Sequence, residues 1–432
     1  MVAMTLMVRW ARIVLAPAWR LGLCAALCLS ALACGGGGSV ASLASGGSGS
    51  SGSSAPTGSN VVSVVVDAGP TTASPDVNTL FTTVTVCVPG TTNCQTIDHI
   101  QVDTGSFGLR ILASVLTVAL PVQTFTNGAS LLECTAFVDG YSWGPVALAD
   151  VQISGESAAS VPVQVIGDPN FTSVPTDCSS IGPAEDTVAT FGANGVLGVG
   201  VFAQDCGAGC VGTVDNGFYY ACTPTALCNS GNSTTVALTG EVTDPVTLFA
   251  ADNNGVIIQL PSVAAQGAAT VTGSMIFGID TQTNNKSGSQ TVLTVDSTAG
   301  EFTTFFNGQP SNQSLNQSFL DTGSNGLYFT DSSIAPCMDT GLTEFYCPAN
   351  TQSLTATLQG QNSVSASVSF SVGNAETLFN NASFAAFPTL GGTYTNSAAT
   401  FDWGLPFYFG RTVYTAFENE TTSVGTGPYV AF

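Results

Sequence analysis

A ten-residue segment that carries an aspartate occurs twice in this chain. Residues 102–111 read VDTGSFGLRI and residues 320–329 read LDTGSNGLYF, with six of the ten positions identical. Two carboxyl groups held a few ångström apart cannot both ionise, so they share a proton and can supply an acid and a base at once. If the two copies face each other, Asp103 and Asp321 form such a pair in one cleft.

The sequence around the two copies has the pattern of short strands joined by turns. It contains 48 glycines, is rich in Ser, Thr and Val, and has no long apolar pattern with the period of a helix. Segments such as VVSVVVDAG and ASVSFSV alternate or run β-branched between turn residues. A chain of 432 residues can hold two lobes with sizeable cores. The sequence therefore predicts an all-β protein with two related lobes, one for each copy.

Further segments resemble the pepsin-like aspartic peptidases and fall in that family's order. They are NGVLGVG at 194–200, SMIFGID at 274–280 and a glycine-bounded C-terminal group at 404–425. The resemblance covers about residues 61–432 and is most specific in the two D-T-G-S loops. It implies the bilobal pepsin-like acid protease fold, with the active cleft between the lobes. Segments 137–144 and 401–407 are also similar to an uncharacterised, lipoprotein-like group of exported bacterial proteins.

The resemblance implies an aspartic-type endopeptidase that needs no metal and no cofactor. In that family a water between the two carboxyls attacks the peptide bond, so Asp103 and Asp321 would be catalytic. The two loop threonines would cross-link the loops, the glycines would let backbone N–H groups approach the carboxylates, and the serines would orient the acids. These supporting residues are Thr104, Gly105, Ser106, Thr322, Gly323 and Ser324. The alternative for the two loops themselves is that they are structural turns, since Asp, Gly and Ser all favour turns.

Three more residues are expected in the substrate cleft. Family members have a flap tyrosine over the cleft, and alignment places Phe137 near that position, with Tyr141 close enough to substitute for it. Arg110 could pair with the two acids, pair with an acidic substrate side chain, or point to solvent. Asp402 occupies a slot that is apolar in the family. These departures leave a second function open, in which a catalytically inactive cell-envelope protein binds a peptide or glycan in the same cleft.

The first 60 residues are expected to serve export rather than the fold. Residues 1–34 have arginines before an apolar run and end in a lipobox-like Ala-Leu-Ala before Cys34, the layout of a secretory signal with lipid attachment at Cys34. Residues 35–60 form a Gly/Ser-rich tether, and the alternative is an ordinary cleaved signal followed by a linker. The N-terminal lobe is then expected at 61–280 and the C-terminal lobe at 281–432. This layout predicts a lipoprotein of the bacterial cell envelope, at the outer membrane or on the periplasmic side.

Cysteine number agrees with export. Of 13 cysteines, Cys24 and Cys28 leave with the signal and Cys34 would carry lipid, so an even number remains for disulfides in an oxidising compartment. Pairing cysteines that are close in sequence is the simplest scheme, and zinc ligation is the competitor. The expected pairs are Cys87 with Cys94, Cys134 with Cys178, Cys206 with Cys210, Cys222 with Cys228, and Cys337 with Cys347.

The net negative charge of the chain limits which molecules it can bind. After loss of the signal, Arg110, Lys286 and Arg411 are the basic residues that remain against 28 acidic ones. Such a surface repels nucleic acid and anionic lipid. The expected partners are therefore a polypeptide substrate and, through a lipid anchor, a membrane, with no nucleic acid and a monomeric state.

Overall fold

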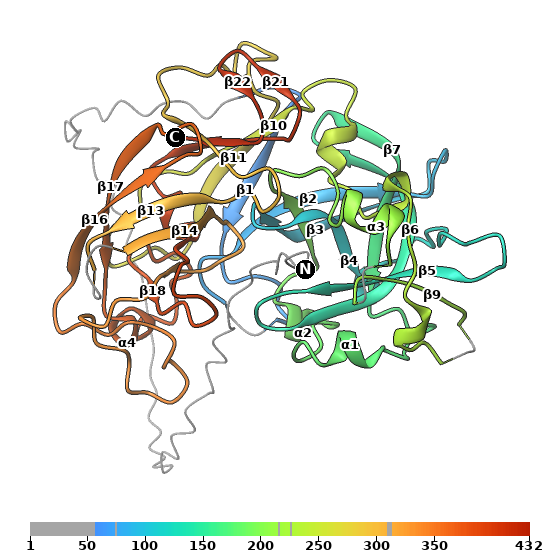
Figure 1. Cartoon of the computed structure of the whole chain (residues 1–432), viewed down its shortest axis with the longest axis horizontal. Coiled ribbons are helices and arrows are strands. Elements are labelled where there is room, and N and C mark those ends of the chain that lie inside the picture. Colours follow the sequence, from blue (N-terminus) through green and yellow to red (C-terminus); the bar gives the residue numbers. More distant parts are fainter. Residues whose placement is uncertain (1–56, 74–75, 215–216, 225–226, 309–312) are drawn as a thin grey trace, which may run out of the picture.

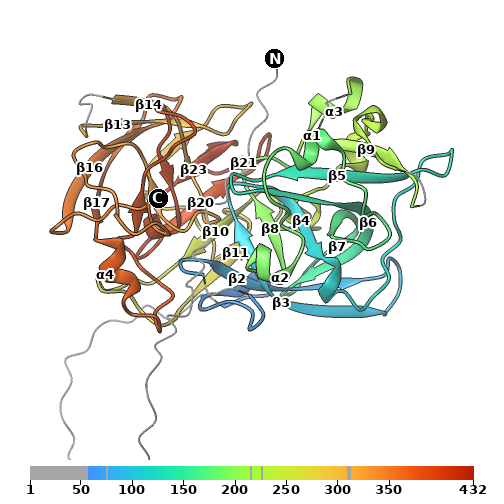
Figure 2. The same ribbon diagram turned by 90° about the horizontal axis from the view of Figure 1, so that it is seen from below.

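Strands dominate the computed structural model, and they gather in two lobes (Figure 1). The structure describes residues 57–432, apart from 74–75, 215–216, 225–226 and 309–312. The signal segment, Cys34 and nearly all of the tether lie outside the described residues. One lobe comes mainly from the first half of the chain and the other from the second half, in both views (Figures 1 and 2). The predicted all-β, bilobal fold class is confirmed.

The largest sheet has 14 strands and runs from the N-terminal lobe into the region between the lobes. Its strands lie in the order β9 (Tyr219–Cys222), β5 (Ser130–Ala136), β6 (Tyr141–Ile153), β7 (Glu156–Ile166), β4 (Phe107–Leu112), β8 (Gly195–Val199), β3 (Cys94–Asp103), β2 (Leu80–Cys87), β1 (Val61–Val66), β11 (Val271–Phe277), β10 (Gly255–Gln259), β20 (Thr412–Ala416), β23 (Tyr429–Ala431) and β12 (Val292–Thr294). At one end of this sheet the neighbouring strands come from both halves of the chain, so this part of the sheet joins the lobes. These strands are β1, β11, β10, β20, β23 and β12. The lobe boundary at residue 280 stays a prediction.

A second sheet forms the C-terminal lobe, and a two-stranded ribbon lies near the C-terminus. The second sheet has the order β17 (Ser365–Val372), β16 (Gln352–Gln359), β13 (Phe302–Phe306), β14 (Gln313–Leu320), β19 (Asp402–Trp403), β15 (Leu327–Tyr328) and β18 (Gly391–Gly392). The ribbon pairs β21 (Thr421–Thr422) with β22 (Gly425–Thr426). Helices are short: α1 (Thr176–Ser179), α2 (Val188–Phe191), α3 (Ala208–Gly212), α4 (Ala375–Phe379), and the 3-10 turns η1 (Ala113–Val115), η2 (Ser230–Asn232), η3 (Leu238–Gly240), η4 (Pro245–Leu248) and η5 (Leu405–Phe407).

The two lobes repeat one strand arrangement around the two aspartate loops. In the first lobe β8 pairs parallel with β3 and antiparallel with β4, and β4 pairs parallel with β7. In the second lobe β19 pairs parallel with β14 and antiparallel with β15, and β15 pairs parallel with β18. Asp103 is the last residue of β3, and Asp321 directly follows β14. The parallel neighbour of each of these strands, β8 or β19, comes from much later in the sequence. The lobes are related in topology as well as in loop sequence.

An aromatic cluster fixes strand β19 in the C-terminal lobe. Phe401 stacks on Trp403 with ring centroids 3.9 Å apart and on Phe329 at 4.6 Å. Successive side chains of a strand point to opposite faces. Because Phe401 and Trp403 face this core, Asp402 between them faces the other way, toward the second aspartate loop.

All five predicted disulfides are present. They link Cys87 to Cys94, Cys134 to Cys178, Cys206 to Cys210, Cys222 to Cys228, and Cys337 to Cys347. Disulfides persist in oxidising compartments, so they indicate an extracellular or periplasmic protein. Within the described residues we find no helix with the length and apolar character needed to span a bilayer.

Candidate active site

The two D-T-G-S loops meet between the lobes and are cross-linked by their threonines. The backbone N–H of Thr104 donates to Oγ1 of Thr322 at 3.1 Å, and the N–H of Thr322 donates to Oγ1 of Thr104 at 3.0 Å. Each hydroxyl then donates to a carbonyl of the opposite strand end, Thr104 to Leu320 at 3.1 Å and Thr322 to Val102 at 2.8 Å. The reciprocal pattern fixes the two loops at one relative position, as the resemblance implied for these threonines.

Further buried hydrogen bonds lie next to this contact between the loops. Oγ1 of Thr104 lies 2.9 Å from the hydroxyl of Tyr408. The amide of Gln101 donates to the carbonyl of Gly323 at 3.2 Å, and the amide of Asn78 donates to the carbonyl of Asn325 at 2.7 Å. The sequence analysis missed these three residues, because their partners lie more than 200 residues away and nothing in their local sequence marks them.

The aspartates lie side by side at the crossing point of the loops, and both are fully buried. The N–H of Gly105 donates to Oδ1 of Asp103 at 2.8 Å, and the N–H of Gly323 donates to Oδ1 of Asp321 at 2.7 Å. A methyl group at Gly105 would lie 2.7 Å from Cγ of Asp321, and one at Gly323 would lie 2.5 Å from Oδ1 of Asp103. Only glycine therefore lets each loop approach the carboxyl of the other.

The carboxyls of Asp103 and Asp321 interact directly. Burial raises the pKa of Asp321 well above its usual value, and the charges of Asp103 and Asp402 and a hydrogen bond with Asp103 raise it further. Oδ2 of Asp103 is buried and accepts no bond from an N–H or hydroxyl group of the described residues. A carboxyl–carboxyl hydrogen bond requires a proton on one partner. Asp321 therefore holds a proton more tightly than a free carboxyl does.

The two loop serines differ in their contacts. Oγ of Ser324 lies 2.7 Å from Oδ2 of Asp321 and 2.6 Å from Oδ2 of Asp402, so Ser324 contacts both carboxyls. Oγ of Ser106 is buried but has no hydrogen-bond partner among the described residues. In the first lobe the position that matches Asp402 in the strand pairing is Val196. The second loop thus has a third carboxyl that the first loop lacks.

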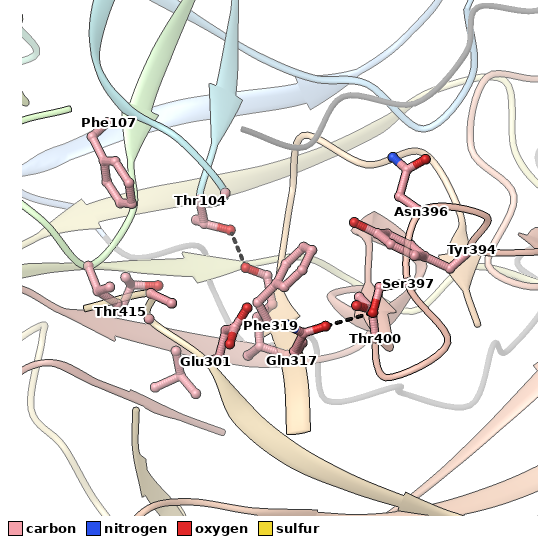
Figure 3. A pocket seen from close by; sticks show the side chains of 16 residues that line it. Thr104, Phe107, Glu301, Gln317, Phe319, Tyr394, Asn396, Ser397, Thr400 and Thr415 are labelled. Carbon is pink, nitrogen blue, oxygen red and sulfur yellow. Dashed lines mark hydrogen bonds between the residues drawn. The ribbon is translucent and has the colours of Figure 1, made fainter. Parts of the chain in front are cut away.

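A pocket of about 250 Å³ opens beside the two loops (Figure 3). Thr104 and Gly105 line it from the first loop, and Leu320, the residue before Asp321, lines it from the second. The remaining walls mix aromatic and polar side chains, among them Phe107, Phe319, Tyr394, Gln317 and Glu301. Burial, together with the charge of Asp296, raises the pKa of Glu301 to about 7.

Phe137 and Tyr141 do not line this pocket, in contrast to the expectation. Phe137 is fully buried in the main core, with its ring 6.1 Å from that of Phe191. Tyr141 packs in a separate cluster of the N-terminal lobe. Both flank the tip of the β5–β6 hairpin, where Val138 packs against the cluster of the other lobe around Tyr328. The hairpin thus spans the two lobes, while its aromatic side chains point into the N-terminal lobe.

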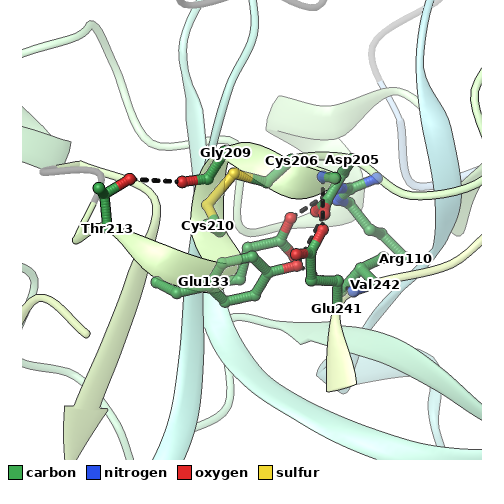
Figure 4. Close-up of a disulfide and its surroundings, with 11 residues drawn as sticks. Arg110, Glu133, Asp205, Cys206, Gly209, Cys210, Thr213, Glu241 and Val242 are labelled. Atoms are coloured by element: carbon green, nitrogen blue, oxygen red, sulfur yellow. Dashed lines mark hydrogen bonds and ion pairs between the residues drawn. A yellow bond between two sulfur atoms is a disulfide. The ribbon is translucent and has the colours of Figure 1, made fainter. Parts of the chain in front are cut away.

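The assignment of Arg110 to the cleft is wrong. Its guanidinium is fully buried, and Nη2 lies 2.5 Å from Glu133 and 2.8 Å from Asp205 (Figure 4). Burial lowers the pKa of Arg110, but the two carboxylates outweigh burial and hold it above its usual value. The cluster lies beside the Cys206–Cys210 disulfide (Figure 4). Arg110 is therefore a structural ion-pair residue of the N-terminal lobe.

One group of possible metal ligands occurs in the described residues, and it includes neither Asp103 nor Asp321. It consists of Cys337, Cys347 and Glu376. The two cysteines form a disulfide, and zinc binds the thiolate form of cysteine. This group therefore does not fit a metal ion.

Comparison with known proteins places the chain in a family. The model of the family described as "Protein of unknown function (DUF3443)" matches residues 56–432. The chain belongs to this family. No curated protein matches it. Among solved structures it is similar to an aspartic proteinase from Irpex lacteus, with 15% sequence identity over 85% of this chain and 96% of the other, and a TM-score of 0.48.

In this DUF3443 protein the loop geometry suits water-mediated acid–base chemistry. Two carboxyls that share one proton present a proton acceptor and a proton donor at the same point. The donor and acceptor are held rigidly, because both loops are cross-linked and both carboxyls accept backbone N–H bonds. A water bonded to both carboxyls could be deprotonated by one while the other polarises an electrophile.

Proposed function

We propose that the chain is an aspartic-type endopeptidase that hydrolyses peptide bonds with a water activated by Asp103 and Asp321. The direct contact between the two buried carboxyls carries this proposal. A purely structural turn has no need to hold two acids together, because burying two close carboxyls is unfavourable. The reciprocal threonine cross-link supports it as well, since it holds the acids within proton-transfer distance.

In the proposed reaction the charged carboxyl takes a proton from the bound water. The water oxygen attacks the carbonyl carbon of the scissile bond, while the protonated carboxyl donates a hydrogen bond to the carbonyl oxygen. The tetrahedral intermediate then collapses, the C–N bond breaks, and the leaving nitrogen takes a proton from the pair. No covalent intermediate with the protein forms. Because the carboxyls titrate together, the acid and base roles belong to the pair.

The second candidate is a catalytically inactive cell-envelope protein that binds a peptide or glycan in the cleft. The full burial of Asp103 and Asp321 favours it, since neither aspartate is accessible to a substrate in this structure. The pocket is lined by their loop neighbours Thr104, Gly105 and Leu320 rather than by the aspartates. A binding protein could keep the loops for their contribution to the fold.

Cleavage of an unfolded protein, followed by mass spectrometry from acidic to neutral pH, tests the two candidates. The parent chain should release fragments, while Asp103→Asn and Asp321→Asn should each reduce the rate roughly 10²–10⁴-fold. Both variants should fold, because Asn is nearly isosteric and removes like-charge repulsion. Asp339→Asn, an exposed acid, is the control and should retain full activity. A parent that cleaves nothing would favour the binding protein, and activity that survives both substitutions would place catalysis elsewhere.

We also propose that Cys34 carries a lipid that anchors the protein to the cell-envelope membrane as a monomer. The small residues before Cys34 and the Gly/Ser tether after it support this. Cys34→Ala should move the protein from the membrane fraction to the soluble fraction, and Cys28→Ala is the matched control. A Cys34→Ala protein that stays membrane-bound would contradict the anchor. The strongly negative chain makes nucleic acid an unsuitable partner.

A further inference from the structure

The pocket beside the two D-T-G-S loops is lined by one carboxylate, Glu301, and no lysine or arginine of the described residues pairs with it. Figure 3 shows the Glu301 carboxylate directed into the pocket next to Phe319. Within the described residues no donor hydrogen-bonds to it, and its strongest charged neighbour is another acid, Asp296. Glu301 also acts electrostatically on Tyr394, the ionisable group on the opposite wall.

The basic side chains of the described structure are all engaged elsewhere. Arg110 lies in the buried cluster with Glu133 and Asp205. The ammonium of Lys286 donates to the carbonyl of Asp280 at 2.7 Å. The guanidinium of Arg411 lies 4.5 Å from the ring centre of Phe407 and bonds to the carbonyl of the same residue. Among the described residues no lysine or arginine is therefore left to neutralise Glu301, and a bound ligand could supply the cation.

The other walls suit the rest of a long basic side chain. Lys and Arg bury their methylene stems along apolar surfaces and keep the charged group at a polar one. Phe319, Leu320 and Val430 provide apolar walls, and Tyr394 adds an aromatic ring. The volume of about 250 Å³ lies just below the ~300–1,000 Å³ of sites for drug-sized ligands, so it suits one side chain rather than a whole small molecule.

We propose that this pocket selects a lysine or arginine side chain of the bound polypeptide, with Glu301 as the residue that recognises its charge. For cleavage, the inference rests on the proposed peptidase function, because the pocket adjoins the loops of Asp103 and Asp321. A peptide that places a basic residue here positions a neighbouring peptide bond near the two carboxyls. The selection depends on pH, since Glu301 binds a cation only when ionised.

Binding can be separated from cleavage with the Asp321→Asn variant. We would use fluorescent octapeptides of Ala and Ser that carry a single lysine, or a single norleucine of similar length, at the fourth or fifth position. At mildly alkaline pH the lysine peptide should bind at least about tenfold more tightly than the norleucine peptide, because hydrogen bonds to charged groups contribute ~1.5–3 kcal/mol. The preference should fade as the pH falls through about 7, where Glu301 takes up a proton.

Adding Glu301→Gln to this variant should abolish the lysine preference and leave norleucine binding unchanged. Glu420→Gln is the matched control, because Glu420 is exposed and does not line the pocket. Equal binding of the two peptides, or a lysine preference that survives Glu301→Gln, would overturn the inference. Cleavage by the parent chain without any basic preference would also overturn it and leave the peptidase proposal intact. Glu301-dependent lysine binding without cleavage would support the pocket and count against the peptidase.

Discussion

Oγ of Ser324 lies 2.6 Å from Oδ2 of Asp402 while it also lies 2.7 Å from Oδ2 of Asp321. A hydroxyl has a single hydrogen, so Ser324 can donate to only one of these carboxyls. At the other contact the hydrogen must come from the carboxyl itself. Asp402 is thus joined to the pair of Asp103 and Asp321 in one hydrogen-bonded chain, in which at least one of Asp321 and Asp402 is protonated.

The first prediction follows from the charge of Asp402. This charge is one of the causes that raise the pKa of Asp321, after burial and the charge of Asp103. Asp402→Asn removes the charge but keeps a hydrogen-bonding side chain, so the pKa of Asp321 should fall. Because the proposed peptidase reaction needs one proton on the pair, activity should then be lost at a lower pH. The pH profile of kcat/KM for peptide cleavage would show its alkaline limb moved toward acid.

The matched control for Asp402 is Asp339→Asn, an exposed acid whose loss should leave the profile unchanged. The charge of Asp402 also acts on Tyr328, Tyr394 and Tyr408, and burial is the largest cause that raises the pKa of each above its usual value. These tyrosines therefore stay neutral over the pH range of the kcat/KM profile, so their ionisation does not contribute to its alkaline limb. An alkaline limb in Asp402→Asn that coincides with the parent's would contradict the electrostatic role of Asp402.

The second prediction concerns the threonine cross-link. Thr104→Val and Thr322→Val each remove a hydroxyl that donates one buried bond and accepts another across the lobes. Unpaired buried donors cost ~1–3 kcal/mol each, so each variant should lower the free energy of unfolding by at least that amount. Thr104→Val should be the more harmful, because it also deprives the buried hydroxyl of Tyr408 of its partner.

Urea denaturation followed by fluorescence measures both variants of the cross-link. Thr351→Val, at an exposed position, serves as control and should change stability by less than ~0.5 kcal/mol. The double variant should be less destabilised than the sum of the two singles, because both belong to one network. A strictly additive double variant would mean that the two hydroxyls act independently, contrary to the structure.

The sequence was sufficient to predict the features that are encoded locally. Asp103 and Asp321 were found because their loops repeat in sequence, and loops that repeat with the same flanking strands take equivalent positions in the two lobes. The disulfides were paired correctly because most partners are close in sequence. Cys134 and Cys178, 44 residues apart, were assigned only because the other eight had been paired.

Features that depend on long-range pairing could not be predicted in the same way. Arg110 lies seven positions after Asp103, which suggested the cleft, but its partners Glu133 and Asp205 are 23 and 95 residues away. Their carboxylates draw the side chain into the N-terminal lobe. Asp402 did leave a signal, an acid in an otherwise apolar slot, although its contact with Ser324 required the strand pairing. Glu301 left none, since it is one acid among 28.

The third prediction follows from the buried ion pairs of Arg110. Arg110→Met would leave the carboxylates of Glu133 and Asp205 buried without a cation, which should lower the free energy of unfolding by ~3–5 kcal/mol at neutral pH. The loss should shrink in acid, because burial and the charge of Glu133 already raise the pKa of Asp205 well above its usual value. Arg411→Met, at a half-buried site without an acidic partner in the described ion pairs, is the control.

A rescue variant sharpens the test of Arg110. Combining Arg110→Met with Glu133→Gln and Asp205→Asn removes the stranded charges, so stability should return most of the way to the parent value. Denaturant midpoints of the parent, single and triple variants decide the outcome. A triple variant that is no more stable than Arg110→Met would show that the loss came from packing rather than from charge.

The fourth prediction concerns Glu241, which is next to the same cluster. Its Oε2 accepts the N–H of Gly207 at 2.6 Å, and burial raises its pKa from 4.5 to about 7. The folded state therefore holds a proton that the unfolded state has already released, so the stability contributed by this group falls as the pH rises from about 4.5 to about 7. Glu241→Gln keeps an acceptor for Gly207 and never ionises.

The thermal midpoint of Glu241→Gln should match that of the parent in acid and exceed it above about pH 7. Glu420→Gln, at an exposed position, should follow the parent at every pH. A Glu241→Gln midpoint that runs parallel to the parent across this range would mean that Glu241 titrates like a solvated carboxyl, and that its burial is relieved in solution.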